Sequence, residues 1–192
     1  DDSTEFAASI DEIIAQAEGM VFQRLPNLPC FRSSATGNLV VGTSDYTVAG
    51  ARMIRQVSTI SSNVVAYLDH RIDSYLRDYW PNSTTTGVPL FYSTKNAGTS
   101  GTAITLAPTP SSILAYQVDY IAPETGLSSS NANSWVGDNA PNVLLPACLH
   151  EGSAFLKAGE TLNLYKAQFD EAVQLFQQEM ARDYKAEYNG GI

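Results

Sequence analysis

The chain has 192 residues, 44% of them hydrophobic, so it is long enough to bury a core as one domain without disulfides or a structural metal. Its net charge of −9 argues against a surface that holds duplex DNA, because such binding neutralises phosphates with Lys and Arg. The charge does not exclude a protein that lets DNA pass without holding it. No apolar run in the sequence is long enough to cross a bilayer.

The N-terminal segment has the spacing of an amphipathic helix. Apolar residues recur every three or four positions, Ser3 or Thr4 can cap the start, and Pro26 prevents continuation. We therefore predict a long first helix over residues 3–25. Residues 27–51 indicate loops and short strands, and residues 53–60 slightly favour a strand.

The middle of the chain changes from helical to strand-like spacing. Apolar residues recur with helical period up to Pro81, so we predict a second helix within residues 63–80. It starts near Asp69, or earlier if Asn63 caps it. Residues 84–122 are rich in Thr, Ser, Gly and Pro but keep three β-branched and aromatic runs, at residues 88–92, 103–106 and 114–121. The last run alternates apolar and polar residues, which a disordered linker lacks. We predict antiparallel strands with exposed, flexible tips at residues 96–101.

The C-terminal third predicts a helical hairpin. Asp138 or Asn139 before Pro141 is a helix-start signature, Gly159 closes that helix, and apolar residues recur regularly over residues 160–188. The short connection makes the two helices antiparallel, and residues 123–139 are predicted to form a loop. The predicted fold class is α+β, with a single domain over residues 1–192. A bundle of three to four helices (residues 3–25, 63–80 and 140–188) carries a small antiparallel β-sheet inserted at about residues 84–122.

No residue pattern in the chain predicts catalysis or metal binding. Asp69, His70 and Asp73 are close enough to suggest a metal or acid–base cluster, but neighbouring arginines favour a salt-bridged surface. Cys148 and His150 are residue types of a thiol enzyme, yet consecutive positions on a helix point in different directions. The sequence has no phosphate-binding glycine loop, zinc spacing or nucleophile elbow. We expect no enzyme activity, no cofactor and no catalytic or metal-binding residue.

Three ordered runs and the hairpin after them carry a resemblance to a known family. The runs are Gly87-Val88-Pro89-Leu90-Phe91-Tyr92, then Ile104-Thr105-Leu106-Ala107-Pro108-Thr109-Pro110, then residues 116–120, and the hairpin is entered after Leu144-Leu145. Together with the N-terminal helix, this order resembles the head-to-tail adaptor proteins of tailed bacteriophages, which include the tail tubular A-like and tail-accessory proteins. The resemblance covers most of the chain.

The resemblance implies a structural virion protein at the head-tail junction, assembled in the host cytoplasm. In this family a dodecameric ring docks beneath the portal protein and continues the DNA channel from the head into the tail. The implied partners are the portal, a tail or nozzle protein and further copies of the chain, with no membrane. DNA passes through without specific binding, and the acidic balance suits such a lumen because like charges keep DNA from sticking.

Three sets of residues are the candidates for contacts in such a ring. Portal docking is assigned to an apolar pair near the C-terminus: Tyr188 and Ile192. Contact with a neighbouring ring or a tail protein is assigned to the predicted strand tip: Asn96, Gly98, Thr99 and Gly101. The candidates for facing the channel are carboxylates of the last helix: Asp170, Glu171 and Glu179. Further acidic residues lie on the first helix: Asp11, Glu12 and Glu18.

Two other functions stay open from the sequence. One is a different virion component, such as a tail terminator or a minor capsid protein. The other is a small carbohydrate- or peptide-binding module that uses Trp80, Trp135 and exposed tyrosines. Size-exclusion chromatography with and without portal protein separates an adaptor from a ligand-binding module.

Overall fold

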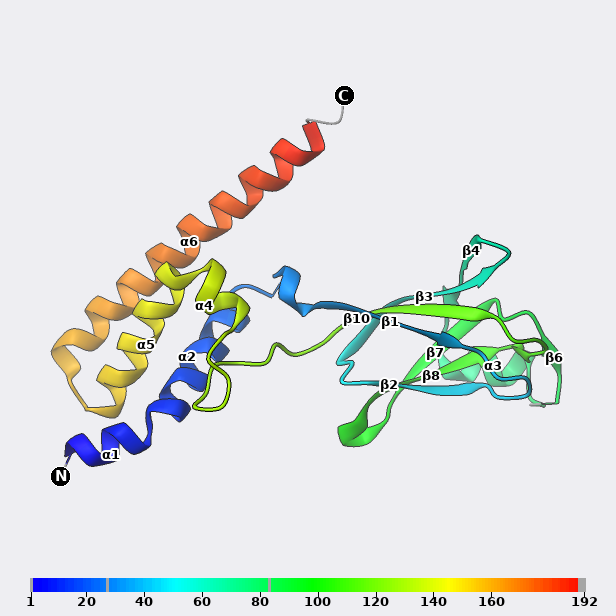
Figure 1. Ribbon diagram of the computed structural model, residues 1–192, viewed down its shortest axis with the longest axis horizontal. Helices are drawn as coiled ribbons and strands as arrows, with labels where there is room; N and C mark the ends of the chain where they lie inside the picture. The colour runs from blue at the N-terminus through cyan, green and yellow to red at the C-terminus, as the bar shows by residue number, and fades with distance from the viewer. Residues whose placement is uncertain (1, 27, 83, 190–192) are drawn as a thin grey trace. The chain divides into compact units, whose positions relative to one another are not determined.

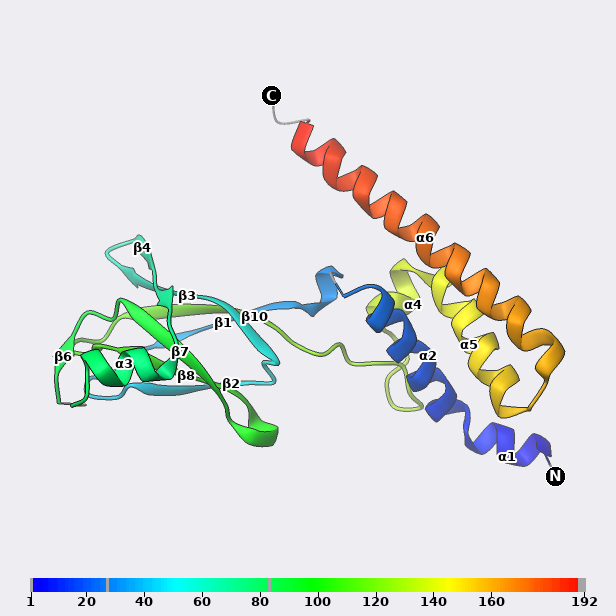
Figure 2. The ribbon, with the colours of Figure 1, turned by 180° about the vertical axis from the view of Figure 1, so that it is seen from behind.

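The computed structural model describes residues 2–26, 28–82 and 84–189 (Figures 1 and 2). The chain folds into two compact units. The helical unit comprises residues 1–28 and 124–192, and the β unit comprises residues Pro29–Pro123. The helical unit is therefore built from the two ends of the chain, and the β unit from the continuous segment between them.

Two consecutive helices open the helical unit, α1 (Asp2–Ala8) and α2 (Ile10–Arg24). The predicted first helix is confirmed, but it is interrupted at Ser9, whose N–H is shared between the carbonyl oxygens of Glu5 and Phe6 at 3.1 Å from each. The apolar stripe seen in the sequence is the packing face of α2, where the buried apolar residues are Ile13, Ala17 and Val21.

Three further helices complete the helical unit, α4 (Trp135–Asn139), α5 (Pro141–Phe155) and α6 (Gly159–Asn189). The predicted α5–α6 hairpin is confirmed, whereas α4 lies in the segment predicted to be a loop. α5 packs against both α2 and α6. With 31 residues, α6 is about 45 Å long, and its C-terminal part extends beyond α5 (Figure 1). Of its described side chains, Phe169 and Val173 are buried.

Two four-stranded sheets and one short strand pair form the β unit. Sheet 1 has the strand order β1-β10-β3-β4, sheet 2 has the order β2-β8-β7-β5, and β6 pairs with β9. Neighbouring strands are antiparallel except in the pairs β5–β7 and β6–β9. The strands are β1 (Arg32–Asn38), β2 (Asp45–Ala49), β3 (Met53–Ser61), β4 (Val64–Tyr67), β5 (Asp69–His70), β6 (Thr86–Gly87), β7 (Phe91–Asn96), β8 (Gly101–Ala107), β9 (Thr109–Pro110) and β10 (Ala115–Ile121).

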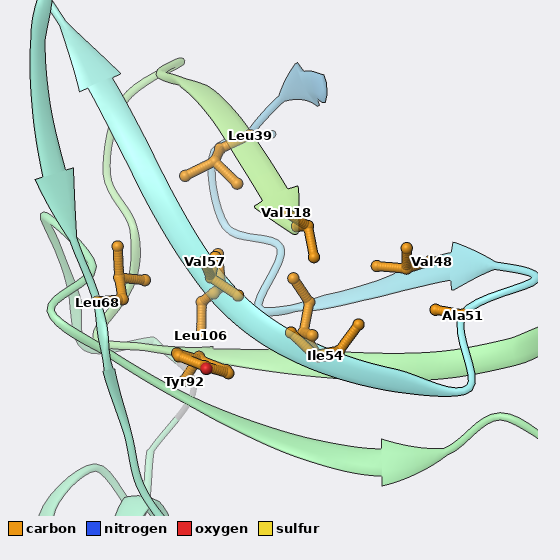
Figure 3. Close-up of a cluster of buried hydrophobic side chains, with 10 residues drawn as sticks. Leu39, Val48, Ala51, Ile54, Val57, Leu68, Tyr92, Leu106 and Val118 are labelled. Carbon is orange, nitrogen blue, oxygen red and sulfur yellow. The ribbon is translucent and has the colours of Figure 1, made fainter. Parts of the chain in front are cut away.

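The core of the β unit takes side chains from both sheets. Sheet 1 contributes residues such as Val57 and Val118, and sheet 2 contributes residues such as Tyr92 and Leu106 (Figure 3). Fully burying an aliphatic side chain contributes roughly 1.5–3 kcal/mol. Packing between the two sheets is therefore the main stabilising term of this unit. The other buried members are Leu39, Val48, Ala51, Ile54, Leu68 and Ile104.

The predicted fold class, a helical bundle with a small inserted sheet, is wrong because it underestimates the β structure. The β structure is not a small insertion at residues 84–122, because it takes in residues 29–123 and forms two four-stranded sheets. The chain is a β-rich α+β protein. The strand favoured at residues 53–60 is confirmed as β3, and the three predicted later strands are confirmed as β7, β8 and β10, although β7 begins at Phe91.

The predicted helix over residues 63–80 fails for a local reason. Ser62 and Asn63 have φ values of 50° and 64°, and this left-handed pair makes a two-residue hairpin turn between β3 and β4. The chain then continues through β5, and only α3 (Asp73–Tyr79) is helical. The apolar period was misleading because it does not mark a buried face: Val64 is 67% exposed and Ile72 is 69% exposed.

Candidate functional site

The suspected cluster at Asp69, His70 and Asp73 is a salt-bridged surface. Arg71 lies 3.5 Å from Asp69, and Arg77 lies 2.7 Å from Asp73, so the predicted ion pairing is confirmed. Among the side chains that the structure describes, no group of three or more His, Cys, Asp or Glu is placed to hold a metal ion. No helix in the described ranges has the length and apolar character needed to cross a membrane.

Cys148 and His150 have separate surroundings on α5. Burial, and then the negative charge of Glu18, raise the pKa of the Cys148 thiol, which therefore stays protonated at neutral pH. The His150 ring places Nδ1 3.3 Å from the carbonyl oxygen of Leu162 on α6. A thiol nucleophile needs the opposite arrangement, a lowered pKa and an adjacent base. Both residues therefore serve helix packing.

A buried carboxylate organises the loop over residues 124–134. Glu18 is only 2% exposed. Its Oε2 accepts the Leu127 N–H at 2.8 Å, and its Oε1 accepts the Ser134 hydroxyl at 2.7 Å. Ser134 also caps α4 by accepting the N–H of Gly137 at 3.1 Å. Glu18 thus joins α2, the loop and α4, and it is not one of the surface carboxylates that the sequence suggested.

The predicted strand tip is the connection between β7 and β8, and it contains the short 3-10 turn η2 (Gly98–Ser100). The Asn96 side-chain oxygen accepts the N–H of Gly98 at 2.8 Å. Gly98 and Gly101 have φ values of 70° and 120°, a region that favours glycine. Asn96 and Gly98 are exposed, and the side chain of Thr99 lies outside the described residues. The tip therefore has a defined backbone shape.

The tip is anchored to the turn between β2 and β3. A Cβ atom on Gly101 would overlap the carbonyl oxygen of Val48 and lie 2.9 Å from the Gly50 nitrogen. The Thr102 hydroxyl donates to the carbonyl oxygen of Ala51 at 2.8 Å. Gly101 is therefore a packing position between two backbone segments rather than an exposed contact residue.

An open hollow of about 760 Å³ borders the tip. Arg52, His70 and Lys95 are among its lining residues, and Lys95 pairs with Asp45 at 2.9 Å. Arg52 and Lys95 are far apart in the sequence, so only the fold reveals that these two basic side chains line one hollow beside the tip. The hollow is wide and open, which suits a partner's loop better than a small substrate.

The three proposed channel-facing carboxylates differ in their surroundings on α6. Asp170 Oδ1 lies 3.3 Å from Arg24 Nη2 on α2. This contact has the distance of an ion pair but not the alignment of a hydrogen bond, and the buried Oδ1 atom has no hydrogen-bond donor in the described part of the chain. Asp170 thus takes part in helix packing, whereas Glu171 and Glu179 are exposed.

The proposed portal-docking pair lies at the edge of what the structure describes. Tyr188 belongs to the last turn of α6, but its side chain is outside the described residues, as is the whole of Ile192. Among the α6 side chains that the structure describes, the last buried one is Val173, and Phe176 packs its ring against Trp135 with 6.5 Å between centroids. The helix continues beyond these contacts for several turns.

Comparison with known proteins gives one clear result. A family model described as SU10 adaptor protein matches residues 1–190. No curated protein matches the chain. The family match takes in both the helical unit and the β unit, and it confirms the resemblance to phage head-to-tail adaptors. The chain therefore belongs to the SU10 adaptor protein family and is a structural phage protein, a component of the virion.

Proposed function

We propose that copies of this chain form a ring beneath the portal protein, dodecameric as in the adaptors that the sequence resembles. The ring joins the phage head to the tail and continues the DNA channel. Its partners are the portal, a tail or nozzle protein and further copies of the chain. The observation that carries the proposal is the adaptor family match over residues 1–190.

The exposed apolar side chains of the helical unit support a role in assembly. Leu145 and Leu149 are exposed on α5, and Leu164 and Leu175 are exposed on α6. Residues 164 and 175 are separated by about three helical turns and so share one face. A ring needs two different and complementary surfaces on each copy, and an apolar helix face provides one of them.

The charge of the chain supports passage of DNA without binding. The net charge is −9, and Glu171 and Glu179 are exposed on α6. A lumen lined by carboxylates repels the phosphate backbone over roughly a Debye length, about 8 Å at physiological salt. We assign Glu171 and Glu179 to that lining, because Asp170 is engaged with Arg24.

The isolated chain is expected to be monomeric or weakly associated, and to assemble into a ring when portal protein is added. A short strand edge or a few leucines bury less than the roughly 1,000 Å² typical of a stable interface. A circular template raises the effective concentration of neighbouring copies. Size-exclusion chromatography with light scattering should give the 20.7 kDa monomer alone and a portal-sized complex in the mixture.

Two outcomes would contradict this expectation. A stable ring in dilute solution without portal would mean that the side contacts are strong by themselves. Failure to elute with the portal would remove the adaptor function, and elution with the tail tube alone would favour a tail terminator instead.

Removing the C-terminal docking pair is expected to weaken portal binding sharply without changing stability. The variant deletes residues 189–192 and carries Tyr188→Ala. Val173 is the last buried residue among the α6 side chains that the structure describes, so we expect the melting temperature to be unchanged within error. Loss of one Tyr and one Ile contact removes a few kcal/mol per copy, and repetition around the ring multiplies the loss. Co-sedimentation with portal should fall at least about tenfold.

The matched control is Lys185→Ala, which changes an exposed residue on the same helical segment. It should co-sediment with the portal like the unchanged protein. If the truncated chain also sediments normally, docking belongs to the helical unit or to the β7–β8 tip rather than to the C-terminus.

A further inference from the structure

Sheet 1 ends in β1 and β4, and sheet 2 ends in β2 and β5; within the described residues each of these strands pairs on one side only. An unpaired edge presents backbone N–H and C=O groups that another strand can bind. Proteins protect such edges with charged residues, prolines or very short strands. The two sheets of this chain differ in that protection.

The edges of sheet 2 carry the usual protection. β5 consists only of Asp69–His70, and Asp69 is ion-paired with Arg71. β2 begins with Asp45, which is ion-paired with Lys95. Charged side chains at an edge must be desolvated before a new strand can dock, so these edges resist pairing.

The edges of sheet 1 carry little of this protection: β1 has one charged residue, Arg32 at its start, and the four-residue β4 has none. Residues 56–68, which contain the β3–β4 turn and all of β4, include no charged residue and no proline, and neither do residues 33–38 of β1. All four residues of β4 are exposed, and Tyr67 is 66% exposed. An apolar, uncharged strand that is exposed on both faces is suited to pairing with another strand.

The free backbone groups on the two edges can be identified. Leu68 N–H donates to the Val57 carbonyl oxygen on β3 at 2.9 Å. Because successive amides of a strand point to opposite sides, the groups of Val65 and Tyr67 point away from the sheet. By the same rule, the 2.8 Å bond from Leu39 N–H to the Leu114 carbonyl oxygen leaves the groups of two β1 residues pointing outward at the other edge: Thr36 and Asn38.

We propose that β4 of one copy pairs with β1 of the next copy, so that sheet 1 continues from copy to copy around the ring. This inference deepens the proposed function and rests on its ring of identical chains. The four strands alternate fully in direction, so β1 and β4 run in opposite directions. Neighbours in the same orientation therefore meet as an antiparallel pair.

The register within sheet 1 aligns the free groups of the two edges. Tyr67 pairs with Ser58, Ser58 with Gln117, and Gln117 with Thr36. Two positions further along the strands, the same series of pairings across the sheet connects Val65 to Asn38. A neighbouring copy can be placed beside the first by a shift perpendicular to the strands, with no shift along them. In that position Tyr67 of one copy lies opposite Thr36 of the next, and Val65 lies opposite Asn38. All four residues carry outward groups, so both rows can form hydrogen-bonded pairs.

The occupant of these edges is a second copy of the chain because the chain itself carries both complementary halves. A head-to-tail contact of this kind repeats from copy to copy, and it closes into a ring when the rotation between neighbours fits a whole number of copies. The alternative, β4 against β4 about a two-fold axis, ends at a dimer and leaves β1 unused. The two arrangements give different cross-linking products.

The test uses cysteines at the aligned positions, Val65→Cys and Asn38→Cys, with mild oxidation of the full chain. Hydrogen-bonded antiparallel residues have Cα atoms about 5.5 Å apart, within the range that a disulfide spans. The double variant should give a ladder of covalent oligomers on the portal, and also in the chain alone at high concentration. A mixture of the two single variants should give dimers only. The unchanged chain, which retains Cys30 and Cys148, is the control.

The outcomes separate the edge pairing from the proposed function. A ring on the portal without a ladder overturns the edge pairing and leaves the adaptor function standing. A ladder in the concentrated chain without portal binding supports the edge pairing and removes the portal-docked function. Absence of a ladder in both preparations overturns the edge pairing, and so does dimerisation of Val65→Cys alone to the same extent as the mixture.

A second pair of variants tests the backbone contact without cysteines. Val65→Pro removes an outward N–H, a position where proline is tolerated on an edge strand. Val65→Thr keeps that N–H while making the side chain polar. Val65→Pro should require about tenfold more protein for half-maximal ring assembly, and Val65→Thr should stay within about threefold of the unchanged chain. Equal effects of both variants, with unfolding curves that match, would overturn the pairing.

Discussion

Replacing Glu18 by alanine is expected to destabilise the helical unit by about 2–4 kcal/mol. The change removes the acceptor of two hydrogen bonds, from the Leu127 N–H and the Ser134 hydroxyl. The original side chain is only 2% exposed, so both donors lose a buried partner and a cavity is left beside them. The midpoint of thermal unfolding, followed by far-ultraviolet circular dichroism, should fall by about 10 °C or more.

Two further variants show whether the contacts, rather than the charge, are responsible. Glu18→Gln keeps an acceptor for the Leu127 N–H and can donate its amide to the Ser134 oxygen, so its loss should be much smaller. Glu12→Ala changes an exposed carboxylate on the same helix and should stay within about 0.5 kcal/mol. A Glu18→Ala variant as stable as Glu12→Ala would show that Glu18 does not organise the loop.

Replacing Gly101 by alanine is expected to destabilise the β unit by about 3 kcal/mol or more, whereas Gly98→Ala costs about 1–2 kcal/mol. Both glycines have positive φ values, so both variants carry backbone strain. Only at Gly101 does the added Cβ meet neighbouring backbone, at Val48 and Gly50; the space around Gly98 is open. The difference between the two variants therefore measures the packing of the tip against the β2–β3 turn.

The fluorescence of Trp80 can follow this unfolding in isolation. The chain has two tryptophans, and Trp80 lies in the β unit whereas Trp135 lies in the helical unit. A Trp135→Phe background leaves Trp80 as the only reporter during denaturant unfolding. Equal midpoints for Gly101→Ala and Gly98→Ala would mean that the tip is not held against the turn and moves freely.

The helices at the two ends of the chain were predictable because their signals are local. An apolar period marks α2, α5 and α6, Pro26 follows α2, and Pro141 stands at the start of α5. Part of each stripe is buried, as at Val21 in α2, Ala147 in α5 and Phe169 in α6. Gly159, which was expected to close α5, instead begins α6. The alternation in β10 was readable for the same reason, since both of its neighbours are strands and its apolar side faces the core.

The first half of the β unit was not predictable from local patterns. β1 consists of Arg, Ser, Ala, Thr, Gly and Asn, and it is a strand because it pairs along its whole length with β10, a segment more than seventy residues later in the chain. The hairpin turn at Ser62 and Asn63 formed where the apolar spacing predicted a helix. Asn63 was a local signal for the turn, because Asn is one of the few residues that tolerates a positive φ. Long-range pairing and turn geometry therefore decided these elements.

The candidate site residues also divide into those that local sequence patterns predict and those that depend on the three-dimensional fold. The exposed tip residues Asn96 and Gly98 could be proposed from composition, because small polar residues between two strands indicate a turn. The burial of Glu18 was visible only as a weak signal: it stands three residues before Val21, on the apolar side of α2. The open edges of sheet 1 depend on strand order, which a single sequence does not reveal.

Electron microscopy of the chain bound to the portal protein of its phage tests the central claim most directly. The proposed function predicts an added ring on the tail-facing side of the portal, coaxial with it and with an open channel. It also predicts that the ring is built from repeated copies of this chain. Absence of the ring, a closed channel, or density on the head-facing side of the portal would contradict the assignment of this protein as the head-to-tail adaptor.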